Sequence, residues 1–397
     1  MPGNLGQKVL NHMGLGGQHP QQPQQQPHQP HQPQHPHQPG QPHPNHHPHQ
    51  PNQPHNQPNH PHQPGKRTVN EDERVLCTHG KGTYPRLARL SDGSILSSFT
   101  RREGNERVLQ VSKSTDNGRS FHDFAEVTRG VGDVDNMFLL EVAPSVILAA
   151  FRNHDVGPGG PRHFRITVCG SSDGGRTWRF LSQAAEKGAP LGLWEPFMRL
   201  GRRGEVQLTY SQEFAHDNQN TMRVISHDQG KTWSKPEIID GAKERLRDGM
   251  NGIAETADNG RDALVMVVET TRYGTFNIEA AISYDDGATW QHRHEVFVPP
   301  RGHNAGSPQI ASWPDGSMAV IFMTDEDSPK VEWTKHASIK VCFSERPQNG
   351  KLHWSRPTVI CPMASCWPGI LALDHHTLLT TYDCGGPKGK SITWRPH

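Results

Sequence analysis

Short apolar runs of strand length recur along residues 67–397, with turn residues between them. A typical unit opens with an apolar run, often closed by a D-G or N-G turn, and three further runs follow it. The inner strand of each unit is predicted to begin near one of six positions: Tyr84, Met137, Trp194, Gly249, Ser307 and Trp367. The pattern predicts six units of about 55 residues, each a small antiparallel sheet.

A sequence motif repeats with the same spacing. The pattern S-x-D-x-G-x-[ST]-[WF] occurs at 114–121, 171–178, 226–233 and 283–290, at steps of 57, 55 and 57 residues. Its Ser and Asp side chains suit hydrogen bonds to the backbone of a tight turn, and its Gly suits a conformation that other residues resist. We therefore assign these aspartates to turns between third and fourth strands rather than to catalysis. A degenerate fifth copy runs from Ser344 to Trp354.

The sixth unit ends near Trp394 with a strand missing, while residues 68–78 precede the first complete unit. Pairing these two ends in one sheet would close a ring and leave no free sheet edge. The prediction is an all-β fold, a six-bladed β-propeller over residues 67–397.

Composition separates residues 1–66 from this propeller. The segment holds 16 of the 34 prolines, 13 of the 27 histidines and no Asp or Glu, and no aliphatic or aromatic side chain lies between Leu15 and Val69. Because no apolar area offsets the entropy of folding, we predict a disordered tail with polyproline II character. Its histidines would also suit weak chelation of divalent ions, but a solvated linker is the preferred interpretation.

Charge and hydropathy exclude several classes of function. Without the two lysines of the tail, the chain has 39 basic and 40 acidic residues, a balance that gives no electrostatic case for binding nucleic acid or an anionic membrane. No run of about 18 apolar residues is visible, so a membrane-spanning protein is excluded. The lack of a secretory stretch and of an N-x-[ST] acceptor disfavours a secreted protein, and the localisation stays open. We expect a monomer that binds a neutral carbohydrate.

The cysteines and histidines give no metal or cofactor motif. The six cysteines contain no C-x-x-C pair and are too sparse for a disulfide framework, so we expect buried free thiols. One bridge among Cys361, Cys366 and Cys384 stays open as an alternative. No cofactor and no metal site is expected.

Ligands of propellers usually bind at the channel mouth where inner strands start and second strands end. That rule selects charged, polar and aromatic residues from all six units, a convergence that solubility alone would not produce. The candidates for substrate binding are Arg86, Arg101, Asp135, Asn136, Arg152, Trp194, Tyr210, Gln212, Asp248, Gln309 and Trp367.

Two carboxylates at this mouth adjoin apolar sequence. Glu195 lies in L-W-E-P-F-M, and Glu269 ends the run A-L-V-M-V-V-E. Burial raises the pKa of a carboxyl group and keeps one of a pair protonated, and glycoside hydrolysis needs one carboxyl as acid and another as nucleophile or base. The alternative is that both make rim salt bridges with Arg86, Arg101 or Arg152.

The repeats and the six units resemble the sialidase superfamily, and the chain looks most like glycoside hydrolase family 93, the fungal exo-α-1,5-L-arabinanases. The resemblance rests on T-Y-P-R-L-A-R-L-S-D-G-S-I-L at 83–96, D-V-D-N at 133–136, L-W-E-P-F at 193–197, R-D-G-M at 247–250, V-M-V-V-E at 265–269, A-G-S-P-Q at 305–309, and W-P-G and T-Y-D in the last unit. It implies Glu195 as general acid/base, Glu269 as nucleophile and Tyr382 beside it.

The resemblance further implies a retaining exo-enzyme that releases arabinobiose from linear α-1,5-arabinan. A retaining mechanism predicts carboxyl groups about 5–5.5 Å apart. The rings of Trp194, Tyr210 and Trp367 would supply apolar faces for sugars.

Two other functions stay open. A sialidase must hold a substrate carboxylate, and sialidases use three arginines from different blades. Arg86 suits one and Arg247 is a candidate for a second, but N-A-G-S-P-Q at 304–309 offers no third. A non-catalytic carbohydrate- or protein-binding propeller is the remaining class, and the missing export signal favours it.

Overall fold

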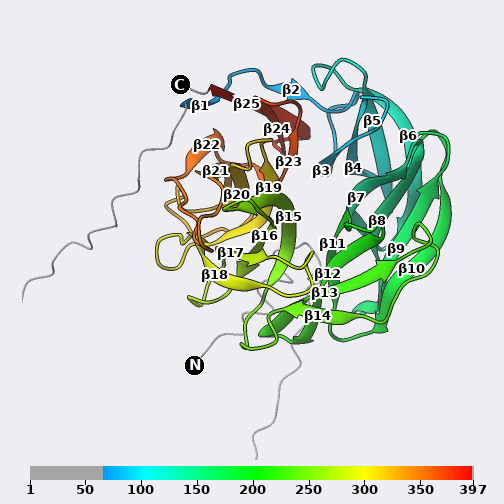
Figure 1. Cartoon of the computed structure of the whole chain (residues 1–397). Coiled ribbons are helices and arrows are strands. Elements are labelled where there is room, and N and C mark those ends of the chain that lie inside the picture. The colour runs from blue at the N-terminus through cyan, green and yellow to red at the C-terminus, as the bar shows by residue number, and fades with distance from the viewer. Residues whose placement is uncertain (1–65, 396–397) are drawn as a thin grey trace, which may run out of the picture.

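The computed structural model describes residues 66–395, and these form 25 β-strands with no helix among them. The strands build six sheets that stand around a central axis, in sequence order around the ring (Figure 1). This confirms the predicted six-bladed propeller. The tail predicted over 1–66 lies, apart from Lys66, outside the described residues. No helix of residues 66–395 has the length and apolarity needed to cross a bilayer.

Blades one to five are four-stranded antiparallel sheets whose first strands line the channel. Blade one is β3 (Thr83–Arg89), β4 (Ile95–Glu103), β5 (Glu106–Ser114) and β6 (His122–Val131); blade two is β7 (Asp133–Ala143), β8 (Val146–Gly157), β9 (Gly160–Ser171) and β10 (Arg179–Gly188); blade three is β11 (Leu193–Leu200), β12 (Val206–Ala215), β13 (Asn218–Ser226) and β14 (Glu237–Asp240); blade four is β15 (Gly249–Asp258), β16 (Arg261–Thr270), β17 (Asn277–Ser283) and β18 (Gln291–Phe297); blade five is β19 (Ala305–Ser312), β20 (Met318–Thr324), β21 (Ser338–Ser344) and β22 (Thr358–Cys361). The inner strands begin within a few residues of the six predicted positions.

Blade six is completed by the segment that precedes blade one, as predicted. Its own strands are β23 (Cys366–Ala372), β24 (Thr377–Asp383) and β25 (Pro387–Arg395), and β1 (Lys66–Val69) and β2 (Arg74–Val75) both pair antiparallel with β25. The closing segment was expected as one stretch from residue 68 to 78. The structure splits it into two short strands because residues 70–73 leave the ladder, and there Asp72 accepts hydrogen bonds from the backbone and side chain of Ser391.

Apolar side chains fill the seams between neighbouring blades. Between blades four and five, for example, Val265, Ile282, Val320 and Phe322 are fully buried in one cluster. Strands that are buried along their whole length, such as β17 and β20, follow from this packing because each face lies against another sheet. Burial of each such side chain contributes roughly 1.5–3 kcal/mol, so the seams hold the ring together.

The four Asp motifs form the turns between third and fourth strands. In the first, Asp116 Oδ1 accepts hydrogen bonds from the backbone N–H of Arg119 and Ser120, and the Ser114 hydroxyl accepts from Gly118 N–H. Equivalent bonds form around Asp173, Asp228 and Asp285. Hydrogen bonds from the hydroxyl groups of Thr177 and Thr232, together with those from the backbone, stabilise the charged carboxylates and lower the pKa of Asp173 and of Asp228 to about 2.

All six cysteines are free, and four of them are buried. The bridge that the sequence left open near the C-terminus is therefore not formed in this structure. Burial raises the pKa of the Cys361 thiol to about 11, and the nearby Cys384 adds to the effect.

Candidate active site

The six inner strands share one irregularity at the channel mouth. Each slips in register against its second strand near its start, as between Trp194 and Phe197. At each slip one non-glycine residue has a φ between +37° and +54°: Tyr84, Asn136, Glu195, Met250, Ser307 and Trp367. A bulge with a left-handed residue re-aims a side chain, and such backbone strain clusters at functional sites. The fold thus presents one side chain per blade at the mouth.

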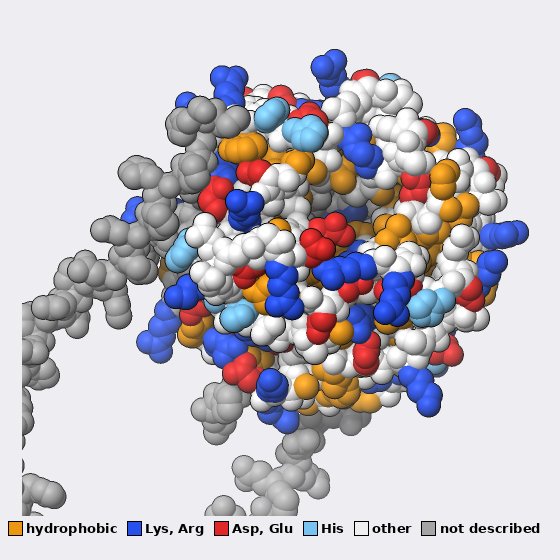
Figure 2. Space-filling model, viewed as in Figure 1, with side chains coloured by type: hydrophobic (Ala, Val, Ile, Leu, Met, Phe, Trp, Pro, Cys, Tyr) orange, Lys and Arg blue, Asp and Glu red, His pale blue; other side chains and the backbone are white. Residues whose placement is uncertain are grey.

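Neighbouring members of this ring touch one another. The rings of Tyr84 and Trp367 stack at 4.2 Å between centroids with an interplanar angle of 26°. On the opposite arc, the Ser307 hydroxyl lies 3.1 Å from the sulfur of Met250. Figure 2 shows acidic and basic side chains gathered around the centre of the ring, with hydrophobic side chains among them.

Glu195 occupies the bulge of blade three. It is 6% exposed, and its Oε1 lies 3.6 Å from Nη1 of Arg152 with no hydrogen-bond partner in the described protein. The pKa of Glu195 is raised to about 8, chiefly by burial and in part by the charge of Glu269, against the opposing effect of Arg152 and Arg247. At neutral pH this carboxyl group therefore keeps its proton.

Glu269 lies at the end of the second strand of blade four, as predicted. It is 5% exposed, and its Oε2 accepts a hydrogen bond of 2.8 Å from the backbone N–H of Ser307. Burial raises its pKa to about 7, but the Ser307 N–H and the charge of Arg247 lower it. The structure thus places two buried carboxyl groups within electrostatic reach of each other.

Arginines of the mouth are largely neutralised by carboxylates. Arg152 lies 3.1 Å from Asp133, and Arg247 donates a 2.8 Å hydrogen bond to Glu213. Arg86 is buried, and its Nη1 donates to the backbone carbonyls of Pro85 and Trp367 rather than to an acid. Burial without an acidic partner lowers the pKa of Arg86 to about 10.

Other predicted binding residues also lie at this mouth. Asp135 accepts a hydrogen bond from the backbone N–H of Asn136, whose Nδ2 has no partner within the described residues. Gln309 Nε2 donates to the carbonyl of Pro308. Trp367 is half-buried, so its ring keeps exposed surface.

Five of the residues predicted to bind substrate instead pair with other residues of the protein or lie in its core. Arg101 pairs with Glu103 at 2.8 Å, Asp248 pairs with Arg293, and Gln212 is half-buried opposite Leu193 in the blade-three ladder. Trp194 and Tyr210 are 3% and 1% exposed and belong to the core between blades two and three. Their rings therefore present no flat face to solvent, contrary to the expectation that they would stack on sugars.

Tyr382 also has a partner that the sequence did not indicate. Its hydroxyl donates a 2.7 Å hydrogen bond to Glu73, which lies between β1 and β2 in the closing segment. No contact joins Tyr382 to Glu195 or Glu269 among residues 66–395. Burial raises the pKa of Tyr382, and the bond to Glu73 adds to this effect.

Several residues of the mouth were not among the candidates. They are Tyr84, whose ring packs against the guanidinium of Arg152, Glu213, which pairs with Arg247, and Ser307, which donates to Glu269. The sequence contains a partial signal for the bulge residues, because proline follows four of the six, at Pro85, Pro196, Pro308 and Pro368. Glu213 carries no such signal, since its role depends on Arg247 across a blade seam.

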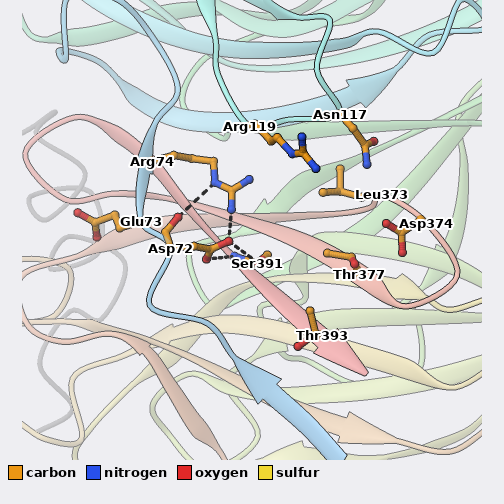
Figure 3. A pocket seen from close by; sticks show the side chains of 10 residues that line it. All are labelled: Asp72, Glu73, Arg74, Asn117, Arg119, Leu373, Asp374, Thr377, Ser391 and Thr393. Atoms are coloured by element: carbon orange, nitrogen blue, oxygen red, sulfur yellow. Dashed lines mark hydrogen bonds and ion pairs between the residues drawn. The ribbon is translucent and has the colours of Figure 1, made fainter. Parts of the chain in front are cut away.

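A separate pocket of about 560 Å³ lies where the ring closes (Figure 3). It is lined by residues of the closing segment, of the first Asp motif and of blade six, including Arg74, Asn117 and Asp374. Arg74 is already bonded to Asp72 and to the carbonyl of Gly118. The pocket contains none of the predicted site residues.

Several solved structures of other proteins share this fold. An α-L-arabinofuranosidase of Fusarium graminearum, solved as a point mutant with an iminosugar inhibitor, is 18% identical with a TM-score of 0.62, over 79% of this chain and 93% of that chain. The α-L-arabinanase of Penicillium chrysogenum, solved with arabinobiose, is 18% identical with a TM-score of 0.60 over the same shares. The fold is shared. The NanB sialidase of Streptococcus pneumoniae is 13% identical with a TM-score of 0.53, over 80% of this chain and 68% of that chain.

Sequence comparison gives a weaker match. No model of a known protein family matches the chain. A curated sialidase of Bacteroides fragilis (strain YCH46) is 24% identical over 263 residues, which cover 57% of this chain. The match spans 44% of that relative, so the chain corresponds to less than half of its length.

Proposed function

We propose that this protein is a glycoside hydrolase whose catalytic pair is Glu195 and Glu269. The observation that carries the proposal is the pair itself: two carboxyl groups, both buried at the channel mouth, with pKa values raised to about 8 and about 7. Two such groups with different environments suit the acid and the nucleophile of glycoside hydrolysis. The similarity in fold to arabinan-degrading enzymes and sialidases supports the same class.

The environments favour distinct roles for the two groups. Oε1 of Glu195 accepts no hydrogen bond, and burial outweighs the nearby charge of Arg152, so Glu195 retains a proton and serves as general acid toward the leaving oxygen. Glu269 accepts the Ser307 N–H, which favours its anion, so it serves as the nucleophile that attacks the anomeric carbon. In the second step Glu195, now deprotonated, takes a proton from the water that hydrolyses the glycosyl-enzyme.

We propose further that the substrate is a neutral glycan, with linear α-1,5-arabinan cut from its end as the first candidate. Arg152 and Arg247 are already paired with carboxylates, so neither is free to hold a substrate carboxylate. Ser307 and Gln309 occupy the fifth-blade position where a third arginine would serve a sialidase. Asn136, Gln309 and Trp367 would hydrogen-bond and pack against the sugar. Neighbours solved with arabinobiose or an iminosugar support this choice.

A sialidase is the second candidate, because Arg86 is a buried cation with no acidic partner and the curated relative is a sialidase. One experiment separates the candidates. The purified full chain is incubated with debranched arabinan and, separately, with a fluorogenic sialoside, and products are resolved by chromatography. Arabinobiose from arabinan alone is the expected result, with NMR detecting retention at the anomeric carbon. Release from the sialoside alone would select the second candidate, and binding without products would select a lectin-like function.

A further inference from the structure

A series of charged groups crosses the seam between blades one and two and ends at Glu195. It starts at Arg107, near the beginning of β5, and continues through Asp135 and Asp133 of β7. Arg152 of β8 lies next, and its guanidinium reaches Glu195. A cation of blade one, two anions and a cation of blade two, and a carboxyl group of blade three therefore follow one another.

The contacts in this series are close and shielded from water. Arg107 Nη1 donates a hydrogen bond to Asp135, and its Nη2 lies 3.6 Å from Asp133. Arg152 Nε is 3.1 Å from Asp133, and its Nη2 is 3.6 Å from Asp135. The two aspartate side chains are 1% exposed and that of Arg152 is 2% exposed. Charges buried this deeply must compensate one another.

The balance of charge decides what Arg152 can contact. Two arginines face two aspartates, so Arg152 is left with one nitrogen, Nη1, that lies 3.6 Å from Oε1 of Glu195. Its guanidinium is also held between two rings, 5.3 Å from that of Tyr84 and 5.9 Å from that of Trp194. Without Arg107, Arg152 would be the only permanent cation that faces both aspartates. His154 Nδ1 lies 3.7 Å from Asp133, but burial lowers the pKa of this imidazole well below its ordinary value.

We propose that Arg107 is a positioning residue for Glu195: by holding Asp135, it leaves Arg152 shared between Asp133 and Glu195. The inference deepens the proposed function, since it assigns control of the general acid to a residue of another blade. Arg107 does not touch Glu195, and it lies on a third strand, outside the positions that the rule for channel mouths selects.

Several other charged or titratable groups act on Glu195. They come from blades one, three and four, and they are Arg86, Tyr84, Glu213, Arg247 and Glu269. None of them contacts Arg107. A change at Arg107 therefore reaches Glu195 through Arg152 and through the uncompensated aspartates, and both effects disfavour the Glu195 anion.

The test is a ¹³C NMR titration of the Glu195 carboxyl in the full chain, with glutamate labelled at Cδ and the resonance assigned by its loss in Glu195→Gln. In Arg107→Met we expect the midpoint to move upward by about 0.5–1 pH unit. Arg107→Lys should restore most of the wild-type value, because it keeps the charge. The matched control is Arg223→Met, which breaks a different arginine–carboxylate pair, that of Arg223 with Glu237 in blade three.

A second variant allows the proposal to be tested if Arg107→Met folds poorly. In Arg107→Met/Asp135→Asn the lost positive charge is matched by a lost negative charge, so the Glu195 midpoint should return to the wild-type value. A merely structural role predicts further damage in the double variant and no recovery. An unchanged midpoint in folded Arg107→Met overturns the proposal, as does an equal upward movement in Arg223→Met.

The titration needs no turnover. If the wild-type protein cleaves neither arabinan nor sialoside, the proposed function fails while the NMR result still decides the role of Arg107. If the protein is active, the alkaline limb of its pH–rate profile should move upward in Arg107→Met together with the NMR midpoint.

Discussion

The backbone N–H of Ser307 in blade five donates a 2.8 Å hydrogen bond to the carboxylate of Glu269 in blade four. The bond joins two blades at the channel mouth and favours the charged form of one member of the buried pair. Glu195 has no equivalent donor, and its pKa is raised to about 8, against about 7 for Glu269. This asymmetry underlies the roles proposed for the two groups and the predictions below.

The first prediction concerns the pH dependence of hydrolysis. The proposed mechanism requires ionised Glu269 and protonated Glu195, so kcat/KM should rise as pH increases toward about 7 and fall as pH passes about 8. Because the two groups interact, the limbs report apparent values of the pair. Steady-state rates from pH 4 to 10 measure this profile. Full activity at pH 4–5 would contradict the assignment of Glu269 as an ionised nucleophile.

The second prediction separates the two glutamates by leaving group. Glu195→Gln should reduce hydrolysis of arabinan by about 10²–10⁴-fold, but it should spare the first step on an aryl glycoside whose leaving group needs no proton. Glu269→Gln should lose activity on both substrates, because the nucleophile is missing. Stopped-flow release of the aryl group provides the measurement, and thermal unfolding confirms that each variant is folded. Equal losses on both substrates in Glu195→Gln would remove it as the general acid.

The third prediction concerns stability. The pKa of Glu195 is higher in the folded chain than its ordinary value of 4.5, so the folded state binds more protons than the unfolded state between about pH 4.5 and 8. The free energy of unfolding therefore declines as pH rises through this window, and burial of the charge destabilises the fold above it. Glu195→Gln should unfold at a higher temperature than the wild type at pH 9, by roughly 2–4 °C for each kcal/mol gained.

At pH 4 the carboxyl group is protonated in both states, so the two proteins should unfold at nearly the same temperature. Glu255→Gln, at an exposed position of β15, serves as the control and should leave the difference between pH 4 and pH 9 unchanged. Differential scanning calorimetry gives the values. A lower unfolding temperature for Glu195→Gln at pH 9 would contradict the burial argument.

The fourth prediction concerns selection of substrate charge. Glu213 neutralises Arg247, so Glu213→Gln should leave a buried cation that attracts carboxylate-bearing sugars. We expect such sugars to inhibit arabinan hydrolysis at least about tenfold more strongly in this variant than in the wild type, equivalent to about 1.4 kcal/mol. Glu237→Gln, which frees Arg223 far from the mouth, should show no gain. Identical inhibition constants in the wild type and Glu213→Gln would show that this pair does not select charge.

The sequence predicted those features that depend on local pattern. The Asp motifs fixed the number and phase of the blades because each motif forms its own turn, and the missing strand of blade six followed from counting. The burial of Glu195 and Glu269 was predictable because a charged residue beside an apolar run is visible in the sequence itself. Contacts across seams were not visible: the bond from Tyr382 to Glu73 joins residues 309 positions apart. The buried faces of Trp194 and Tyr210 depend likewise on the packing of blade two against blade three.

The closure of blade six also dictates an order of assembly. Because β1 pairs with β25, Asn70 hydrogen-bonds to Ser391 across 321 positions of sequence. During synthesis β1 and β2 emerge first and have no partner until β25 has been made, so five blades can form before the ring closes. Contacts of such high sequence separation form late because the loop entropy must be overcome first. The two strands therefore stay unpaired until the last blade has been made, and during this stage the chain is most open to non-native strand pairing.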